Sequence, residues 1–374
     1  MSFRVLMTSD AVGGVWNYSV SLAEALAPHG IEIHLATMGP APSPEQRQAA
    51  ERLSNLTLHV STYRLEWMDQ PWKDLEWSGE WLMQLEEQLK PDLIHLNTYA
   101  HGTLPWRAPV MAVGHSCVYS WWRHVKGTEP PRFWNRYREA VAAGLAGADL
   151  IAAPTRAMLD ELACTYGPFA APTRVIPNGV DGARFAPAEG KQDLIFAAGR
   201  VWDEGKNVQS ICMAAPGLSW PVRVAGEATS PDGRAIDCPD VELLGKVPAD
   251  EMPSHYAQAA IFAHPARYEP FGLAPVEAAL SGCALVLGDI DTLREIWRGA
   301  ALFVPPDDVA ELRRTLQDLS ANEPLRLRLA ETARARALEL TPEAMARGVL
   351  EAYASLTEHR AAEIPAPAGE RIAS

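Results

Sequence analysis

Two successive runs of short apolar segments, each segment followed by a helix-like stretch, place the strongest limit on how this chain folds. The first run extends to residue 153 and contains the segments FRVLM, IEIHLATM, LTLHV, DLIHL, PVMAVG and DLIAAP. The second run contains DLIFAAG, PVRVAG, VELLG, IFAHPA, CALVLG and ALFVP. Alternation of buried strands with helices is typical of parallel βαβ sheets. The pattern therefore predicts an α/β protein with two such sheets.

Length and a turn-rich segment divide the chain into two domains. The 374 residues exceed one ordinary core and suit two domains of about 150 to 200 residues each. The segment PNGVDGARFAPAEGKQ, residues 177–192, separates the two strand runs. We place the boundary there, with a first domain at 1–177 and a second at 178–340. Residues 361–374 are predicted to form a disordered tail.

Composition excludes several classes of protein. The formal net charge of −14 disfavours nucleic-acid binding, which depends on clustered Lys and Arg. The apolar runs are much shorter than the roughly 20 residues of a membrane span, and the N-terminus lacks a signal-peptide pattern, so we expect a cytoplasmic protein. Five cysteines without C-x-x-C spacing favour free thiols over a disulfide framework or a zinc site. They are Cys117, Cys164, Cys212, Cys238 and Cys283.

The decamer YEPFGLAPVE, residues 268–277, carries the most specific chemical signal. It follows an apolar strand segment and opens into a helix, so it lies at the carboxyl end of a strand, where open α/β sheets bind ligands. The N–H groups of Gly272 and Leu273 belong to the first helical turn and favour an anion such as a diphosphate. Glu277 is placed to accept hydrogen bonds from ribose hydroxyls, and Glu269 to meet the sugar of the same ligand.

This decamer resembles the E-x7-E signature of retaining glycosyltransferases of the GT-B fold, family 4 (glycosyl transferases group 1). Four further segments match the family in order, and together the matches span roughly residues 3–305. They are DAVGGVW (10–16), VGHS (113–116), VIPNGVD (175–181) and GRVWDEGKN (199–207). The resemblance implies two Rossmann-like domains that face each other across a cleft, the first for the acceptor and the second for a nucleotide-sugar donor. It also implies that a last helix, about 341–358, returns to the first domain.

The activity implied by the resemblance is transfer of a hexose, with retention of anomeric configuration, from a UDP- or GDP-sugar to a sugar, lipid or small-metabolite acceptor. No metal or other cofactor is expected. In the family, counterparts of Arg200 and Lys206 clasp the diphosphate, and both follow the segment DLIFAAG. Alternatively, Arg200 and Lys206 have no role in binding and lie in a solvated loop, with an ordinary ion pair to Asp203 or Glu204. The glutamate that corresponds to Glu269 lies beside the donor sugar's hydroxyls and is counted as catalytic without a covalent role.

Other matching positions belong to the first domain and the linker. Gly13 and Gly14 form a strand-to-helix turn where the backbone can approach the donor, with a plain turn as the alternative. His115 directly follows the segment PVMAVG. The resemblance implies that it contacts the transferred sugar's hydroxyls, as the family's histidine does; a structural histidine is the alternative. Asn178 is assigned to the donor cleft wall or hinge.

The acceptor site is predicted from composition. Nine of the twelve tryptophans precede residue 135, and the segment 121–138 mixes aromatic with basic residues. Aromatic faces stack on sugar rings and guanidinium groups bind anions, which assigns Trp121, Trp122 and Arg123 to the acceptor. The alternatives are contact with an anionic lipid surface at the inner face of the membrane and simple core packing.

Rival functions remain open from the sequence. The same fold serves sugar-nucleotide epimerases and phosphorylases, and a noncatalytic sugar-nucleotide-binding protein would keep the donor site. A dehydrogenase is disfavoured because the first glycine turn lacks the G-x-G-x-x-G fingerprint and its trailing ribose-binding acid.

Overall fold

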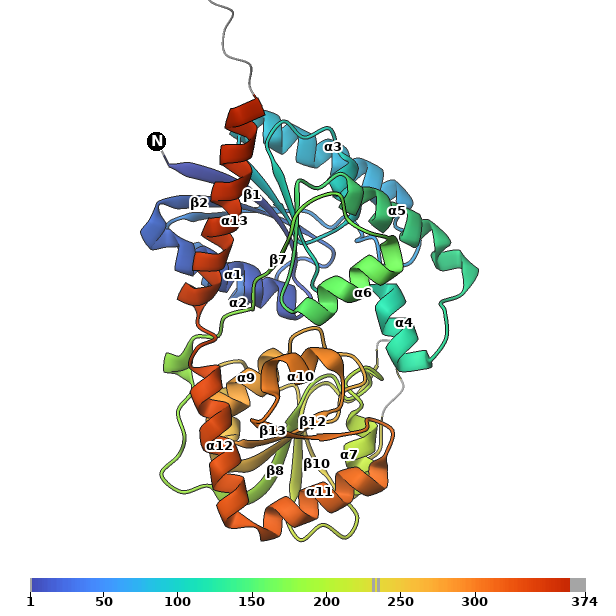
Figure 1. Cartoon of the computed structure of the whole chain (residues 1–374), viewed down its shortest axis with the longest axis vertical. Helices are drawn as coiled ribbons and strands as arrows, with labels where there is room; N and C mark the ends of the chain where they lie inside the picture. The colour runs from blue at the N-terminus through green and yellow to red at the C-terminus, as the bar shows by residue number, and fades with distance from the viewer. Residues whose placement is uncertain (1, 231–232, 234–235, 364–374) are drawn as a thin grey trace, which may run out of the picture.

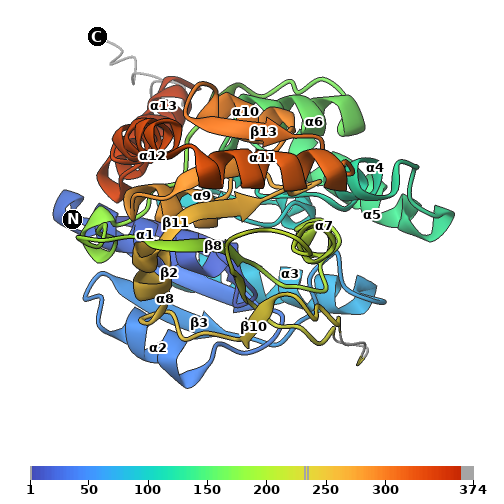
Figure 2. The same ribbon diagram turned by 90° about the horizontal axis from the view of Figure 1, so that it is seen from below.

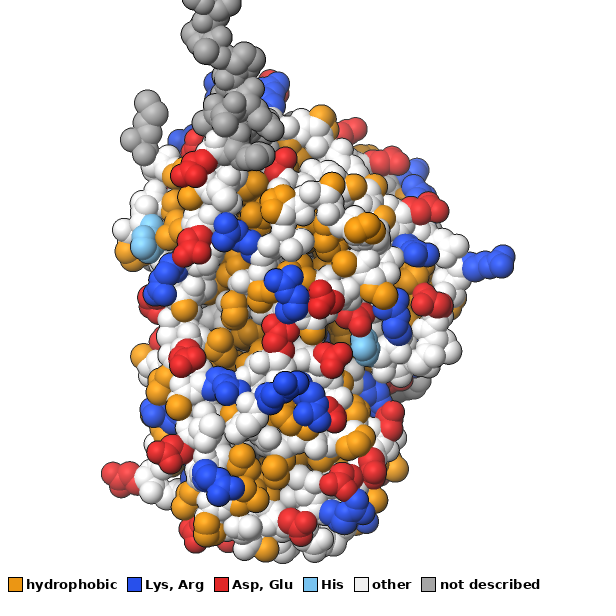
Figure 3. Space-filling model, in the orientation of Figure 1, with side chains coloured by type: hydrophobic (Ala, Val, Ile, Leu, Met, Phe, Trp, Pro, Cys, Tyr) orange, Lys and Arg blue, Asp and Glu red, His pale blue; other side chains and the backbone are white. Residues whose placement is uncertain are grey.

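The computed structural model describes residues 2–230, 233 and 236–363, which form two α/β domains stacked end to end (Figure 1). Each domain is built around one parallel sheet with helices on both faces. Lys and Arg side chains are interspersed with Asp and Glu side chains over the face shown in Figure 3. Two parallel-sheet domains were predicted from the alternation of strands and helices, and this prediction is confirmed.

Within the described residues, the first domain contains a seven-stranded sheet in the order β3-β2-β1-β4-β5-β6-β7. The strands are β1 (Phe3–Asp10), β2 (Ile31–Met38), β3 (Leu56–Val60), β4 (Leu93–Leu96), β5 (Val110–Val113), β6 (Leu150–Ala153) and β7 (Thr173–Val175). The six apolar segments predicted as strands form β1 to β6. The edge strand β7 was not predicted, because its three residues are too few and too polar to give a pattern.

The second sheet, over the same described part of the chain, has six strands in the order β10-β9-β8-β11-β12-β13. They are β8 (Gln192–Ala198), β9 (Val222–Ala225), β10 (Glu242–Gly245), β11 (Ala259–His264), β12 (Ala284–Gly288) and β13 (Ala301–Val304). Each corresponds to a predicted segment. In both sheets the chain order reverses beside the first strand, between β1 and β4 and between β8 and β11, which creates a ligand-binding crevice at the carboxyl ends.

Helices cover both faces of the two sheets. They are α1 (Gly14–Leu26), α2 (Pro44–Glu51), α3 (Trp72–Leu89), α4 (Val118–Lys126), α5 (Asn135–Ala146), α6 (Arg156–Tyr166), α7 (Val208–Ala214), α8 (Met252–Gln258), α9 (Leu273–Leu280), α10 (Asp291–Trp297), α11 (Val309–Ala321), α12 (Glu323–Ala337) and α13 (Pro342–Glu363). In the second domain, α7 and α11 pack on one face of the sheet, and α8 and α9 pack on the other (Figure 2).

Helix α13 runs back along the first domain and packs against α1 (Figure 1). The Tyr353 hydroxyl lies 2.7 Å from Nδ1 of His95, a buried histidine of β4. The helix continues to residue 363, so residues 361–363, predicted as part of the tail, are helical. Their sequence, Ala-Ala-Glu, consists of good helix formers, which extend the preceding pattern. The rest of the predicted tail, 364–374, lies outside the described residues.

The prediction that all five cysteines remain thiols is wrong for two of them. Cys212 on α7 and Cys238 before β10 form a disulfide bond. They are 26 residues apart, and only the packing of α7 beside the segment that follows β9 brings them together, so their spacing gave no signal. Cys117, Cys164 and Cys283 are free thiols.

A helix that crosses a bilayer needs about 20 predominantly apolar residues. No helix in the described residues is both long enough and apolar enough to cross a bilayer.

Candidate active site

A cavity of about 310 Å³ lies between the two domains, beside the crevices of both sheets. We refer to it as the interdomain cavity. Many of the residues selected from the sequence line it: Gly14, His115, Asn178, Lys206, Glu269, Gly272 and Leu273. The parallel sheets explain this convergence, because carboxyl ends of neighbouring strands meet at one edge.

The turn that opens α9 depends on a glycine. Gly272 has a φ of +92°, in the left-handed region, and a Cβ atom there would lie 3.1 Å from Cγ of Pro275. Other residues rarely adopt this backbone conformation. The turn presents the first N–H groups of α9 at the cavity, and such groups lack partners within their own helix. This end of α9 therefore favours an anionic ligand.

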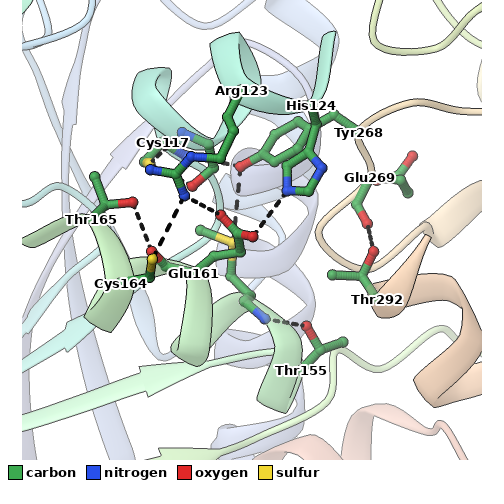
Figure 4. Close-up of polar contacts among 12 residues, drawn as sticks. Cys117, Arg123, His124, Thr155, Glu161, Cys164, Thr165, Tyr268, Glu269 and Thr292 are labelled. Atoms are coloured by element: carbon green, nitrogen blue, oxygen red, sulfur yellow. Dashed lines mark hydrogen bonds and ion pairs between the residues drawn. The ribbon is translucent and has the colours of Figure 1, made fainter. Parts of the chain in front are cut away.

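A buried charge cluster lies beside the turn. Oε2 of Glu269 is 2.5 Å from Nζ of Lys206 and 3.0 Å from Nε2 of His264, the last residue of β11. Burial acts to raise the pKa of Glu269, but Lys206 and the His264 hydrogen bond outweigh it and hold the pKa far below its ordinary value of 4.5. The Thr292 hydroxyl donates to the backbone oxygen of Glu269 at 2.6 Å (Figure 4). Glu269 is therefore an oriented carboxylate.

His115 faces this cluster from the first domain as a neutral imidazole. Burial lowers its pKa to about 4. Its Nε2 lies 2.7 Å from Oδ1 of Asn97, whose amide nitrogen donates to the backbone oxygen of Thr8 at 2.8 Å. Because the amide oxygen only accepts, Nε2 carries the proton and Nδ1 is left as an acceptor. His115 can therefore accept a hydrogen bond from a hydroxyl group of a ligand.

A second cavity, of about 340 Å³, adjoins the first, and Val15, His115 and Ser116 line both. We refer to it as the aromatic cavity. Its aromatic side chains are Trp67, Tyr99, Trp121, Trp122, Trp134, Tyr137 and Tyr268. Its polar side chains include Asp10, Glu66, Asn97, Thr98 and Arg200. The two cavities meet at His115, so a reacting group could pass from one ligand to the other there.

Arg200 lines the aromatic cavity, whereas Lys206 lines the interdomain cavity. Nη2 of Arg200 is 2.9 Å from Oδ2 of Asp203, and the Arg200 side chain is half exposed. The sequence left open an ordinary ion pair between Arg200 and Asp203, and the structure contains that pair. The two cations that follow β8 therefore have different surroundings in the structure.

Three of the selected residues line neither cavity. Gly13 lies in the exposed turn before α1, with a φ of +87°. Glu277 is on α9, where burial raises its pKa to about 7 although a hydrogen bond with Tyr256 acts to lower it. Arg123 points from α4 toward α6, and its Nη1 is 3.2 Å from Oε2 of Glu161 (Figure 4).

The sequence did not single out several polar residues of the site, among them Asp10, Asn97, His264 and Tyr268. Asp10 and His264 end strands, and Asn97 directly follows one. Tyr268 belongs to the turn that precedes α9, residues 268–272, which we call the motif turn. The rule that drew attention to His115, which places ligands at the carboxyl ends of strands, applies equally to Asp10, Asn97 and His264. Their hydrogen bonds, by contrast, could not be read from the sequence.

Direct contacts join the two domains around the site. The Cys117 backbone N–H, before α4, donates to the hydroxyl oxygen of Tyr268 at 3.0 Å (Figure 4). The Thr155 hydroxyl donates to the backbone oxygen of Pro270 at 3.1 Å. The carboxylate of Glu295 accepts from the first two N–H groups of α6, at 2.7 and 2.9 Å. The motif turn is therefore anchored to the first domain.

A metal site needs several His, Cys, Asp or Glu side chains that converge on one point. No group of three or more His, Cys, Asp or Glu side chains in the described residues is arranged to hold a metal ion. An Asp-x-Asp sequence, Asp289 to Asp291, does follow strand β12. Asp289, however, is paired with Arg294, whose Nη2 is 2.7 Å from Oδ2 of the aspartate.

Comparison with protein families divides the chain into two matched regions. Residues 12–184 match the family described as Glycosyltransferase Family 4. Residues 184–336 match the family described as Glycosyl transferases group 1.

The chain is similar to several known glycosyltransferases. It is 30% identical over 199 residues to a glycogen synthase of Mycobacterium tuberculosis, an alignment that covers 48% of this chain and 47% of that protein. The chain therefore spans about half the length of that relative. It is 25% identical over 407 residues to a D-inositol 3-phosphate glycosyltransferase of Nocardia farcinica, covering 97% of this chain and 89% of that protein.

Solved structures share the fold at low sequence identity. Sucrose-phosphate synthase from Thermosynechococcus elongatus superposes with a TM-score of 0.79 at 18% identity, covering 96% of this chain and 100% of the other. Anabaena HepE in complex with UDP-glucose gives a TM-score of 0.73 at 18% identity, covering 94% and 100%. With both regions matched in order and two facing parallel-sheet domains, the chain belongs to the GT-B glycosyltransferases, in the group of family 4.

Proposed function

We propose that this protein is a retaining, metal-independent glycosyltransferase that moves a hexose from a nucleoside-diphosphate sugar, UDP- or GDP-linked, to an acceptor in the aromatic cavity. One observation carries the proposal: the first turn of α9, the Lys206–Glu269 pair and His115 line the same interdomain cavity. HepE, a structural neighbour, was solved with UDP-glucose, which supports a nucleotide-sugar donor.

The residues have separate roles in this proposal. The N–H groups of Gly272 and Leu273, together with the Lys206 ammonium, neutralise the departing diphosphate. Glu269, held by Lys206 and His264 through Oε2, accepts hydrogen bonds from sugar hydroxyls through its other oxygen. Nδ1 of His115 accepts from a further hydroxyl of the same sugar.

Glu277 and Asn178 complete the donor site in this proposal. Glu277, on α9, accepts from the ribose hydroxyls, and Asn178 forms part of the cavity wall. Gly14 gives the donor close access to the backbone of the first domain.

The transfer step is a front-face substitution. The bond between the anomeric carbon and the diphosphate oxygen breaks, and its electron pair remains on the diphosphate. The acceptor oxygen bonds to the same face of that carbon, and its proton passes to the departing phosphate oxygen. The protein supplies positioning and charge neutralisation, which act most strongly in a site that excludes water.

A binding panel tests the donor site. Calorimetry with UDP, GDP, ADP and their sugar conjugates, with and without EDTA, should show one preferred nucleotide, no effect of EDTA, and much weaker binding by Lys206→Ala. Loss of binding in EDTA would refute metal independence. Absence of binding by every nucleotide would refute the proposed donor site.

A product assay distinguishes glycosyl transfer from epimerisation and from binding without catalysis. Proton NMR of the product should show the same anomeric configuration as the donor. An inverted product would refute retention, whereas a nucleotide sugar altered only in its ring would indicate an epimerase. Tight nucleotide binding without turnover, over the full acceptor panel described below, would indicate a noncatalytic binding protein.

A further inference from the structure

The aromatic cavity has a composition that bears on the chemical class of its ligand. Four indole rings line it, from Trp67, Trp121, Trp122 and Trp134. Trp67 is 43% exposed, and Trp121 and Trp122 are partly exposed, so part of this aromatic surface is accessible. Indole faces suit the C–H faces of a pyranose ring, and binding sites of this kind combine apolar walls with few polar groups.

Three basic side chains of the segment 121–138, those of Arg123, Lys126 and Arg136, do not line this cavity and are engaged in other contacts. Arg123 is held by Glu161 of α6, and Nζ of Lys126 is 2.6 Å from a carboxylate oxygen of Glu204 in the second domain. The Arg136 guanidinium stacks on the Trp72 ring outside the cavity, 4.2 Å from its centre. These cations cannot serve an anionic ligand inside the aromatic cavity without breaking existing contacts.

The charged groups that do line the cavity are mostly acidic. Arg200 is the cation among the described lining residues, and it is already paired with Asp203. Both oxygens of Glu66 accept backbone N–H groups, at 2.9 and 3.0 Å. Oδ1 of Asp10 accepts from the Val12 backbone at 2.7 Å, and no donor in the described residues is bonded to its Oδ2.

We propose that the aromatic cavity binds an uncharged, unphosphorylated sugar as the acceptor, with its ring against the indoles and one of its hydroxyls donating to Oδ2 of Asp10. This inference rests on the proposed function. A phosphorylated sugar would place like charge beside Asp10, and like-charge contacts in a binding site cost several kcal/mol. The free carboxylate oxygen instead matches a hydroxyl donor.

The burial of Asp10 and its position at the end of β1 are typical of a carboxyl group that binds a ligand. Burial raises its pKa to about 6, although the Val12 hydrogen bond and Arg200 act to lower it. It ends β1 beside the chain reversal of the first sheet, the position where open α/β sheets bind ligands. Asp10 is therefore a positioning and specificity residue for the acceptor.

The test compares matched acceptors on the full chain. Neutral hexoses, their methyl glycosides and disaccharides are compared with hexose 6-phosphates and with glucosamine, using the donor identified by the nucleotide panel. Quenching of tryptophan fluorescence in the presence of the nucleoside diphosphate measures acceptor binding independently of turnover. We expect at least one neutral sugar to bind, and its 6-phosphate to bind at least tenfold more weakly, which corresponds to about 1.4 kcal/mol.

Variants distinguish an effect of the Asp10 charge from general damage to the fold. Asp10→Asn should remove most of the discrimination between the neutral sugar and its phosphate, while nucleotide affinity stays unchanged. Trp122→Ala should weaken neutral-sugar binding. Trp77→Phe is the matched control, since Trp77 on α3 is 51% exposed and lies outside the cavity; this variant should leave the acceptor KM unchanged.

The outcomes distinguish this inference from the proposed function. If nucleotide sugars bind and a hexose phosphate or glucosamine binds better than every neutral sugar, the inference is overturned and the donor site stands. The inference would also be overturned if Asp10→Asn and wild type discriminated equally between the neutral sugar and its 6-phosphate. If no sugar in the panel binds while the nucleotide does, the aromatic cavity is not a sugar site.

Discussion

Removal of the Lys206 charge is expected to leave a buried carboxylate without its main partner. In Lys206→Met, most of the side-chain volume remains, but Glu269 loses the ammonium that lies 2.5 Å from its Oε2. The two side chains are only 24% and 11% exposed, so water screens the pair weakly. Breaking such a pair by removing one partner costs about 3–5 kcal/mol.

His264 moderates this cost because its Nε2 still donates to the same carboxylate oxygen. We therefore expect a loss near the lower limit, about 3 kcal/mol. For a domain of 150 to 250 residues, each kcal/mol lowers Tm by about 2–4 °C, so Lys206→Met should melt about 6–12 °C below wild type at pH 7. The wild-type stability from Glu269 is present above its ordinary pKa of 4.5 and is lost as the pH falls toward its lowered folded value.

Thermal unfolding of wild type, Lys206→Met, Glu269→Gln and the double variant gives the decisive comparison. The double variant leaves no uncompensated charge, so it should be more stable than Lys206→Met although it carries one more substitution. Glu269→Gln alone should cost less, because the partly exposed Lys206 ammonium can reach water. A Tm for Lys206→Met within 2 °C of wild type, or strictly additive losses in the double variant, would refute the reasoning.

Three further predictions concern stability. Glu277→Gln should stabilise the protein at pH 8 by up to about 3 kcal/mol but hardly at pH 4.5. The reason is that the pKa of Glu277 is raised to about 7 in the folded protein, so wild-type stability falls as the pH rises from 4.5 through 7. Equal Tm shifts at both pH values would contradict this. Tyr353→Phe should lower stability by about 1–3 kcal/mol, since it leaves Nδ1 of buried His95 without its partner on α13, and an unchanged denaturation midpoint would count against that contact. Gly144→Ala should prevent normal packing of α5, because the new Cβ would lie 1.8 Å from the backbone oxygen of Tyr99; a wild-type melting curve would exclude the close approach.

The parts of the fold that the sequence predicted share one physical origin. Most predicted strands are apolar runs buried on both sides, such as β4, β5, β6 and β11, and this pattern is typical of parallel sheets and is visible without knowledge of contacts. The edge strands β3 and β10 are less buried but still carry a recognisable apolar run. The short edge strand β7 lacks that pattern. The selected residues that meet in the interdomain cavity, such as His115 and Glu269, follow from the same rule, because carboxyl ends of parallel strands share an edge.

The hydrogen bonds of the site depend on long-range packing and could not be predicted. Asn97 and His115 follow different strands, β4 and β5, and the tautomer of the imidazole follows only from the observed contact between Nε2 and the amide oxygen. The disulfide between Cys212 and Cys238 is a similar case. In both, residues distant in sequence meet through the arrangement of complete elements.

The direction of side chains on α4 shows why composition alone cannot define an acceptor. Adjacent residues on an α-helix point about 100° apart, so a cavity lined by Trp121 and Trp122 of α4 need not be lined by the next side chain, Arg123. In the structure Trp122 lines the aromatic cavity, whereas Arg123 reaches Glu161 on α6. A segment that looks both aromatic and basic in the sequence thus presents its rings to the site and its charges elsewhere, which is the physical basis for expecting a neutral sugar there.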